Sequence, residues 1–229
     1  MSGKVWMSSV LSNYALLIDQ GIRNKYFGYE WEPAQIDHVG GYQPNPDILL
    51  ETSLRSRSGH PLQRQEFPEA SAVWDVKRYS KVHDFFNIGP FHAVKGKVAE
   101  VLSRFDLGDG GLIPYPIYKA DLVMPMGEEF FLLNFGARKD SFLPELSNNV
   151  AKSVVQVATG RQLWGINSWH EDGDVALSPA ALEGPDLWFE EVVSYGEIFM
   201  SDSLAQALIE IGMKDLFALK GCRIVEDGQ

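Results

Sequence analysis

The side chains best suited to chemistry are concentrated in the segment Trp169–Asp174, which reads Trp-His-Glu-Asp-Gly-Asp. The carboxylates of Glu171, Asp172 and Asp174, with the imidazole of His170, can bind a hard cation or act as acid and base. The segment lacks the twelve-residue pattern of a calcium-binding loop, and an acidic turn between strands is the commoner origin of such a cluster. The sequence therefore favours a surface turn and keeps a metal-binding or small-molecule enzyme as the alternative.

No other motif in the sequence demands an enzyme. The five histidines lack the close spacing of a helical zinc motif, and no Gly-x-Ser-x-Gly nucleophile elbow is present. The glycine-rich segment Gly108–Gly111 lacks the lysine and hydroxyl residues of a phosphate-binding loop. The single cysteine, Cys222, excludes an internal disulfide, and its apolar neighbours indicate a small buried residue instead of a nucleophile. We therefore expect no catalytic residues, no metal and no cofactor.

A second polar segment combines acidic and aromatic residues. The aromatic run Leu187–Phe189, with Trp188 at its centre, is surrounded by the carboxylates of Glu183, Asp186, Glu190 and Glu191. An exposed tryptophan inside an acidic rim would suit a protein interface, because tryptophan is a frequent hot spot and carboxylates orient a basic partner. The alternative is that Trp188 belongs to the core and the acids are solvated.

The charge of the chain limits its partners. The sequence has 31 acidic and 20 basic residues, and its formal net charge is −11. Such a balance repels phosphate backbones, so direct binding of nucleic acid is disfavoured, whereas a basic protein partner is suitable. No window approaches eighteen apolar residues, and the first residues show no cleavage pattern of a signal peptide. We expect a cytoplasmic protein that does not associate with membranes.

The last thirty residues show the clearest structural pattern. Ile198–Met200 read as a strand end, Ser203 and Gln206 form a capping box, and Gly212 can end the helix that follows. The expected apolar face of this helix consists of Leu204, Ala207, Leu208 and Ile211. A second strand is predicted around Cys222, Ile224 and Val225.

Other segments support an α+β fold with a mostly antiparallel sheet and a few packed helices. The apolar spacing within Phe91–Phe105 predicts a helix, Leu112–Tyr118 an edge strand, and Glu129–Phe135 a buried strand. A hairpin is expected around Thr159, between residues 150–157 and 162–166.

Residues 1–84 are predicted to be rich in strands and loops, with no long helix up to about residue 50. Arg55–Pro61 is the expected boundary or exposed loop. We expect an α+β domain over residues 85–229, and residues 1–84 are either separate from it or part of the same domain.

The order and spacing of three packing motifs give the chain a family resemblance. Phe91–Phe105 followed by Gly111–Ile117, the strand Phe130–Asn134, and Ile198–Leu208 with Gly212 together resemble the immunity proteins of family eleven in bacterial polymorphic toxin systems, formerly a domain of unknown function. The resemblance covers residues 85–229. It implies a non-enzymatic cytoplasmic protein that binds a cognate toxin encoded nearby and occludes its active site.

We expect the toxin contacts in the two acidic and aromatic segments, because the packing motifs themselves leave no residue for recognition. They are Trp169, His170, Glu171, Asp172, Asp174, Glu183, Asp186, Trp188, Glu190 and Glu191. Residues 1–84 are the other candidate for recognition. A self-associating structural subunit remains a further alternative, since sheet edges and aromatic residues can form a homo-oligomer.

Overall fold

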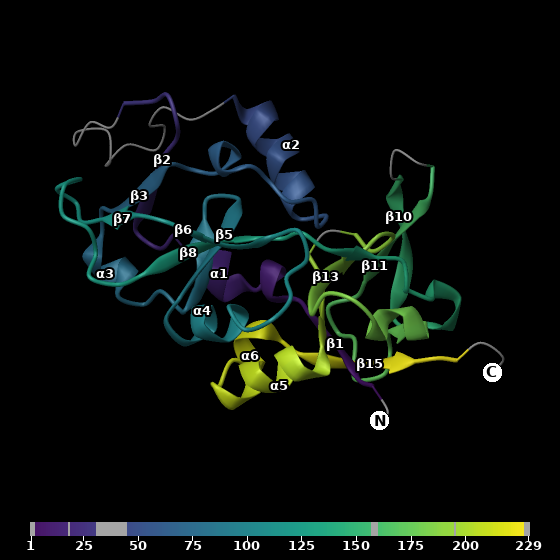
Figure 1. Cartoon of the computed structure of the whole chain (residues 1–229). Helices are drawn as coiled ribbons and strands as arrows, with labels where there is room; N and C mark the ends of the chain where they lie inside the picture. Colours follow the sequence, from purple (N-terminus) through teal and green to yellow (C-terminus); the bar gives the residue numbers. More distant parts are fainter. Residues whose placement is uncertain (1–2, 18, 31–44, 157–159, 195, 227–229) are drawn as a thin grey trace.

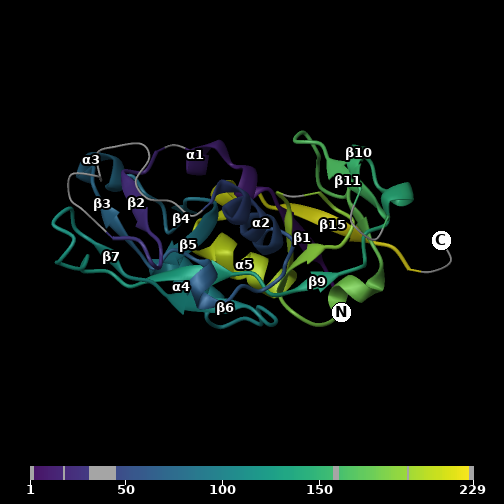
Figure 2. The ribbon, with the colours of Figure 1, turned by 90° about the horizontal axis from the view of Figure 1, so that it is seen from above.

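The computed structural model describes residues 3–17, 19–30, 45–156, 160–194 and 196–226. Its fold is α+β, and most of its strand pairs are antiparallel. Figure 1 shows two groups of strands side by side, with β2 to β8 on the left and β1, β13 and β15 with the β10–β11 hairpin on the right. Seen from above, β7 and the β10–β11 hairpin lie at opposite ends of the molecule (Figure 2).

The largest sheet has six strands and draws on both ends of the chain. Its order is β12 (Ala176–Leu177), β15 (Lys220–Ile224), β1 (Val5–Ser8), β14 (Ile198–Ser201), β13 (Leu187–Glu190) and β9 (Arg138–Lys139). β1 pairs antiparallel with both β14 and β15. Because side chains alternate along a strand, Val5 and Met7 enter one core cluster and Trp6 enters another. The sheet is therefore buried on both faces at β1.

Two smaller sheets form the other group of strands. One has the order β4 (Phe85–Ile88), β5 (Phe91–Lys95), β8 (Phe130–Asn134) and β6 (Gly111–Pro114), and the other has the order β2 (Ile22–Lys25), β3 (Ala70–Val73) and β7 (Ile117–Tyr118). A core cluster that includes Phe67, Phe86, Phe91 and Phe130 joins them. The hairpin of β10 (Val150–Gln156) and β11 (Gln162–Ile166) forms a separate pair.

The helices are short and lie around these sheets. They are α1 (Tyr14–Leu17), α2 (Pro46–Ser56), α3 (Val76–Tyr79), α4 (Gly96–Leu102), α5 (Asp202–Glu210) and α6 (Lys214–Phe217), with the 3₁₀ turns η1 (Val10–Ser12), η3 (Arg64–Glu66), η4 (Pro144–Leu146) and η5 (Pro179–Leu182). Buried side chains of α4 and α5 meet in one core cluster, which contains Val98, Leu102, Leu204 and Leu208. No helix in the described part of the chain is long and apolar enough to span a membrane.

The closing unit confirms the predicted strand, helix and strand, with one correction at the start of the helix. The hydroxyl oxygen of Ser201, not that of Ser203, accepts a hydrogen bond from the backbone N–H of Leu204. Gln206 instead donates its side-chain amide to the carboxylate of Asp202 at 3.2 Å. The expected capping box is therefore wrong by two residues, whereas Gly212 adopts the predicted left-handed conformation with φ +81°.

The predicted helix over Phe91–Phe105 is wrong in its first five residues. Phe91–Lys95 form β5, whose first four residues are buried, and α4 begins only at Gly96. An almost continuous apolar run suits a central strand as well as a helix, and the four-residue spacing of Val94 and Val98 spans the junction of the two elements.

The expectation of no long helix up to residue 50 is also wrong, because α2 has eleven residues and begins at Pro46. The side-chain oxygen of Asn45 accepts from the N–H of Asp47 at 2.9 Å, so Asn-Pro-Asp starts a helix here. Residues 31–44 lie outside the described residues. The predicted strands β8 and β14 and the β10–β11 hairpin are present; the tip of the hairpin at Thr159 lies outside the described residues.

Strands from residues 1–84 pair with strands from residues 85–229. β1 lies between β14 and β15, and β3 pairs with β7. The backbone ladders thus join the two regions that the sequence distinguished.

Candidate partner-binding site

A tight junction between β5 and α4 positions the first carboxylate of the candidate site. Gly96 adopts φ +51°, and a Cβ atom there would approach Asp84 Oδ2 to 2.7 Å. The Asp84 carboxylate instead accepts a hydrogen bond from the backbone N–H of Lys97 at 3.1 Å. Glycine is therefore needed for both the backbone conformation and the close approach of Asp84.

A groove of about 690 Å³ lies beside this junction, lined by residues of α4, β6 and β8 together with Asp84, Lys95, Glu128 and Glu129. Ala99, Leu112 and Phe131 supply the apolar part of its lining. Leu112 and Phe131 are partly buried and also pack against the core cluster that contains α4 and α5. The apolar part of the groove is thus supported from beneath by the core.

The polar part of the groove is strongly acidic. Four carboxylates, those of Asp84, Glu100, Glu128 and Glu129, line it, and Lys95 is the one basic side chain among its described lining residues. The ammonium of Lys95 already forms an ion pair with Glu128 at 2.7 Å. Glu100 and Glu129 are exposed, and their side chains make no hydrogen bond or ion pair with the described residues.

This combination suits the side chains of lysine and arginine. Their aliphatic stems can lie along Leu112 and Phe131, and their charged groups can reach the carboxylates. The volume of the groove is within the range of small-ligand pockets in proteins. The arrangement can therefore hold a basic segment of a protein partner, and it contains no cysteine or histidine among its described lining residues.

The groove left no signal in the sequence, for a physical reason. Asp84 precedes β4, Glu100 lies on α4, and Glu128 and Glu129 precede β8. Pairing of β4 with β5 and of β5 with β8 brings these segments together. A long-range arrangement of this kind leaves no local pattern, although the adjacent pair Glu128 and Glu129 before an apolar strand was visible.

The turn at residues 169–174 uses most of its carboxylates to hold its own backbone. Asp174 accepts from the side chain of Asn149 at 2.8 Å and from the N–H of Glu171 at 2.7 Å. Its hydrogen bonds, with that from Asn149 as the largest cause, hold the pKa of its carboxyl below the usual value. Asp172 accepts from the N–H of Gly221 on β15 at 2.6 Å. These contacts fit an acidic turn that is tied to the six-stranded sheet.

The other side chains of the turn divide between the interior and the surface. His170 is buried, and its Nδ1 atom lies 2.8 Å from the carbonyl oxygen of Asn167. Trp169 is 69% exposed, and Glu171 is exposed without a side-chain partner. Among the described residues, no group of three or more His, Cys, Asp or Glu side chains is placed to hold a metal ion. Trp169 and Glu171 are the members of this segment that a partner can reach.

Trp188 and Glu190 are not surface residues, so their expected role as exposed toxin contacts is wrong. Trp188 is 1% exposed and Glu190 is 3% exposed. Glu190 accepts from Trp188 Nε1 and from the backbone N–H groups of Ser141 and Phe142, at 2.8, 2.8 and 3.0 Å, and also from the Ser141 hydroxyl. Burial raises the pKa of Glu190, and these bonds oppose the shift.

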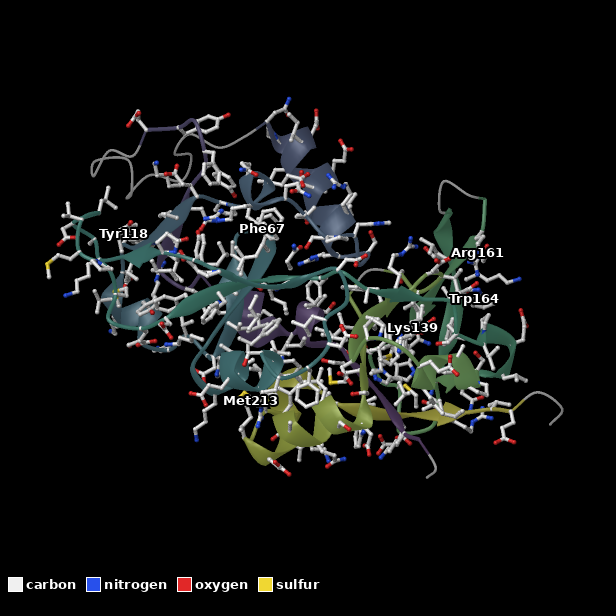
Figure 3. The ribbon with its side chains drawn as sticks, viewed as in Figure 1. Phe67, Tyr118, Lys139, Arg161, Trp164 and Met213 are labelled. Carbon is white, nitrogen blue, oxygen red and sulfur yellow. The ribbon has the colours of Figure 1, made fainter. Side chains whose placement is uncertain are left out.

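A lysine completes this buried group. The Lys139 ammonium lies 3.5 Å from the centroid of the Trp188 ring and donates to the carbonyl of Ala181 at 3.0 Å. Burial lowers the pKa of Lys139 to about 8, although Glu190 opposes the shift. Figure 3 shows Lys139 below Arg161 and Trp164, on the side of the molecule that carries the β10–β11 hairpin.

The remaining predicted contacts of this segment are separate from one another. Asp186 accepts from the N–H of Asp106 at 3.0 Å and from the hydroxyl of Ser201, so it holds a loop and the start of α5. Glu191 forms an ion pair with Arg161 at 2.8 Å. Glu183 is exposed and has no side-chain partner among the described residues. The structure thus leaves Trp169, Glu171 and Glu183 as the accessible and uncommitted members of the predicted set.

The chain was compared with models of protein families and with curated proteins, and no match was found in either case. The resemblance to immunity family eleven therefore stays a prediction from the order of three sequence motifs.

Proposed function

We propose that this protein is an immunity protein that binds a toxin encoded by a neighbouring gene and neutralises it by occluding its active site. The observation that carries the proposal is the groove beside α4, which joins an apolar lining to four carboxylates and one paired ammonium. A basic segment of the toxin fits this chemistry, because opposite charges accelerate association and exclude acidic competitors.

The net charge of −11 supports the same partner class. A toxin that acts on nucleic acid has a basic cleft for phosphates, and carboxylates of an inhibitor can occupy the phosphate positions. Neutralisation by the groove thus needs no chemical step, only a complex that dissociates slowly enough to keep the substrate out of the toxin's active site.

Trp169, Glu171 and Glu183 provide a second set of contacts within the same proposal. An exposed tryptophan is the residue type that contributes most to protein interfaces. The groove and Trp169 belong to different groups of strands, since α4 follows β5 and Trp169 precedes β12. Substitutions in the groove and at Trp169 therefore test two separate surfaces.

Co-expression of the protein with the product of the adjacent toxin gene tests the proposal. We expect growth with the native protein, and loss of protection with the double substitution Glu100→Lys and Glu129→Lys. The matched control is Glu51→Lys, which makes the same charge change per site at an exposed helical position of α2. Failure of the native protein to protect, together with the absence of a complex, would reject the proposed function.

A further inference from the structure

A loop of residues 119–127, between β7 and β8, presents apolar side chains at one end of the molecule. Figures 1 and 2 both place this loop beyond β7, at the end opposite the β10–β11 hairpin, and Figure 3 shows Tyr118, the residue before it, at the same end. Val123 is 75% exposed and Met124 is 52% exposed. Two adjacent large apolar side chains at a loop tip form a small apolar surface that a partner can cover.

The backbone of the loop is held in one conformation. The N–H of Lys119 donates to the carbonyl of Met124 at 2.8 Å, and the N–H of Leu122 donates to the carbonyl of Lys119 at 2.9 Å. The Asp121 carboxylate accepts from the N–H groups of Val123 and Met124 at 3.0 and 2.9 Å. These bonds fix the tip before any partner arrives.

The base of the loop is tied to the core and to the sheet. Met126 donates its N–H to the carbonyl of Ile117 at 2.8 Å, and its side chain packs against the core cluster that contains Phe130. Leu122 adopts φ +60°, a conformation that is unfavourable for a leucine and that the surrounding hydrogen bonds maintain. The exposed apolar tip is thus a rigid projection, and its immobilisation costs little further entropy on binding.

The loop is continuous with the acidic groove. Glu128 and Glu129, which line the groove, follow the loop directly in the chain. The ion pair of Glu128 with Lys95 anchors this connection to the end of β5. A protein that lies in the groove therefore has the base of the loop at the edge of its contact surface.

We propose that the 119–127 loop inserts Val123 and Met124 into an apolar pocket of the same toxin whose basic segment lies in the acidic groove. The proposal rests on the proposed function, since it names the second half of the surface that recognises the toxin. The toxin is accordingly a protein in which a basic ridge borders an apolar depression. The charge of the groove attracts and orients the toxin, and the loop adds apolar surface that is buried in the complex.

The test is a titration of the purified toxin domain, encoded by the adjacent gene, with variants of the full chain. We expect the double substitution Val123→Ala and Met124→Ala to weaken binding roughly 10- to 100-fold. Most of this loss should appear as faster dissociation, with a smaller decrease in the association rate. The matched control is Leu50→Ala on α2, because Leu50 is 59% exposed; its affinity should equal that of the native protein.

Variants of Asp121 distinguish the effect of the fixed loop conformation on binding from the effect of the carboxylate charge. Asp121→Asn keeps an oxygen that accepts from Val123 and Met124, whereas Asp121→Ala removes it. We expect Asp121→Ala to weaken binding and Asp121→Asn to retain it, with unchanged melting temperatures for both. Equal weakening by both variants would show that charge, not the fixed tip, matters, and would overturn the proposal.

The outcomes distinguish this inference from the function on which it rests. Native affinity for the Val123 and Met124 variant, with weakened binding of the Glu100 and Glu129 variant, overturns the loop proposal and keeps the proposed function. Absence of binding by the native protein rejects both.

Discussion

The substitution Glu190→Gln tests the assignment of Glu190 and Trp188 to the core. Oε2 of Glu190 accepts from the N–H groups of Ser141 and Phe142, and Oε1 accepts from Trp188 Nε1 and from the Ser141 hydroxyl. All four bonds require an acceptor at Glu190, so the geometry fits the ionised carboxylate. A glutamine amide has the same shape but replaces one oxygen by a donor.

Neither orientation of the glutamine amide satisfies the site. With its oxygen toward the two backbone N–H groups, its NH₂ group faces Trp188 Nε1, which is only a donor, although the Ser141 hydroxyl can turn to accept. With the amide reversed, the NH₂ group opposes two backbone donors. At least one buried donor therefore loses its partner, which costs about 1–3 kcal/mol. Loss of the charge that attracts Lys139 adds to this, so we expect a total of about 2–4 kcal/mol.

The assay is urea denaturation followed by circular dichroism, arranged as a double-mutant cycle. Trp188→Phe removes the donor that Glu190→Gln leaves without a partner, so the glutamine should cost about 1–2 kcal/mol less in that background. Glu191→Gln is the matched control, because its ion pair with Arg161 lies at the surface and should contribute no more than about 1 kcal/mol. Equal costs for Glu190→Gln and Glu191→Gln, or additivity in the cycle, would refute the reasoning.

Two further predictions concern groups whose pKa is shifted by burial. Burial raises the pKa of Glu197 to about 8, so the stabilising contribution of its neutral carboxyl is present below the unfolded pKa and is lost as the pH rises toward 8. Denaturation should therefore show that Glu197→Gln is more stable than the native protein by about 4 kcal/mol at pH 8 but by only about 1 kcal/mol at pH 5. Burial and the charge of Arg57 lower the pKa of His92 to about 3. The neutral imidazole therefore stabilises the fold above the unfolded pKa of histidine, and this stabilisation is lost on acidification. The free energy of unfolding should fall by about 1.4 kcal/mol at pH 5.5 through His92 alone. The Asn87 amide donates to the Leu16 carbonyl at 2.7 Å, so its oxygen faces His92 Nδ1 at 2.9 Å and accepts a hydrogen from it. Nitrogen NMR should therefore find the Nδ1–H tautomer of His92 down to pH 4, and a protonated ring at pH 6 would contradict this.

Patterns in short stretches of sequence were sufficient for much of the fold. The strand Phe130–Asn134 follows from a continuous apolar run, and the end of α5 follows from Gly212, which adopts φ +81°. Both signals act within a few residues. The boundary between β5 and α4 was missed, because it depends on Gly96, where the close approach of the distant Asp84 leaves no room for a side chain.

The position of Trp188 shows a signal that the sequence did contain. Trp188 and Glu190 are two residues apart on β13, so they share a face of the strand. A carboxylate in that position can accept the indole N–H, and this favours a buried pair over an exposed aromatic residue with an acidic rim. The burial of both side chains confirms the core alternative for Trp188.

The groove could not be predicted from short sequence patterns. Glu100 and Glu129 become neighbours in one lining only after α4 packs on the sheet that contains β8. The composition predicted a basic partner from the net charge, but it could not say where on the surface the carboxylates would gather.

The most direct test of the central claim is a calorimetric titration of the adjacent-gene toxin domain with three proteins: the native chain, Glu100→Lys with Glu129→Lys, and Glu51→Lys. We expect a stoichiometric complex with the native chain and with Glu51→Lys, affinity that falls as salt rises, and binding at least about tenfold weaker for the groove variant. Equal affinities for the groove variant and the native chain would contradict the assignment of the acidic groove as the site that binds the toxin.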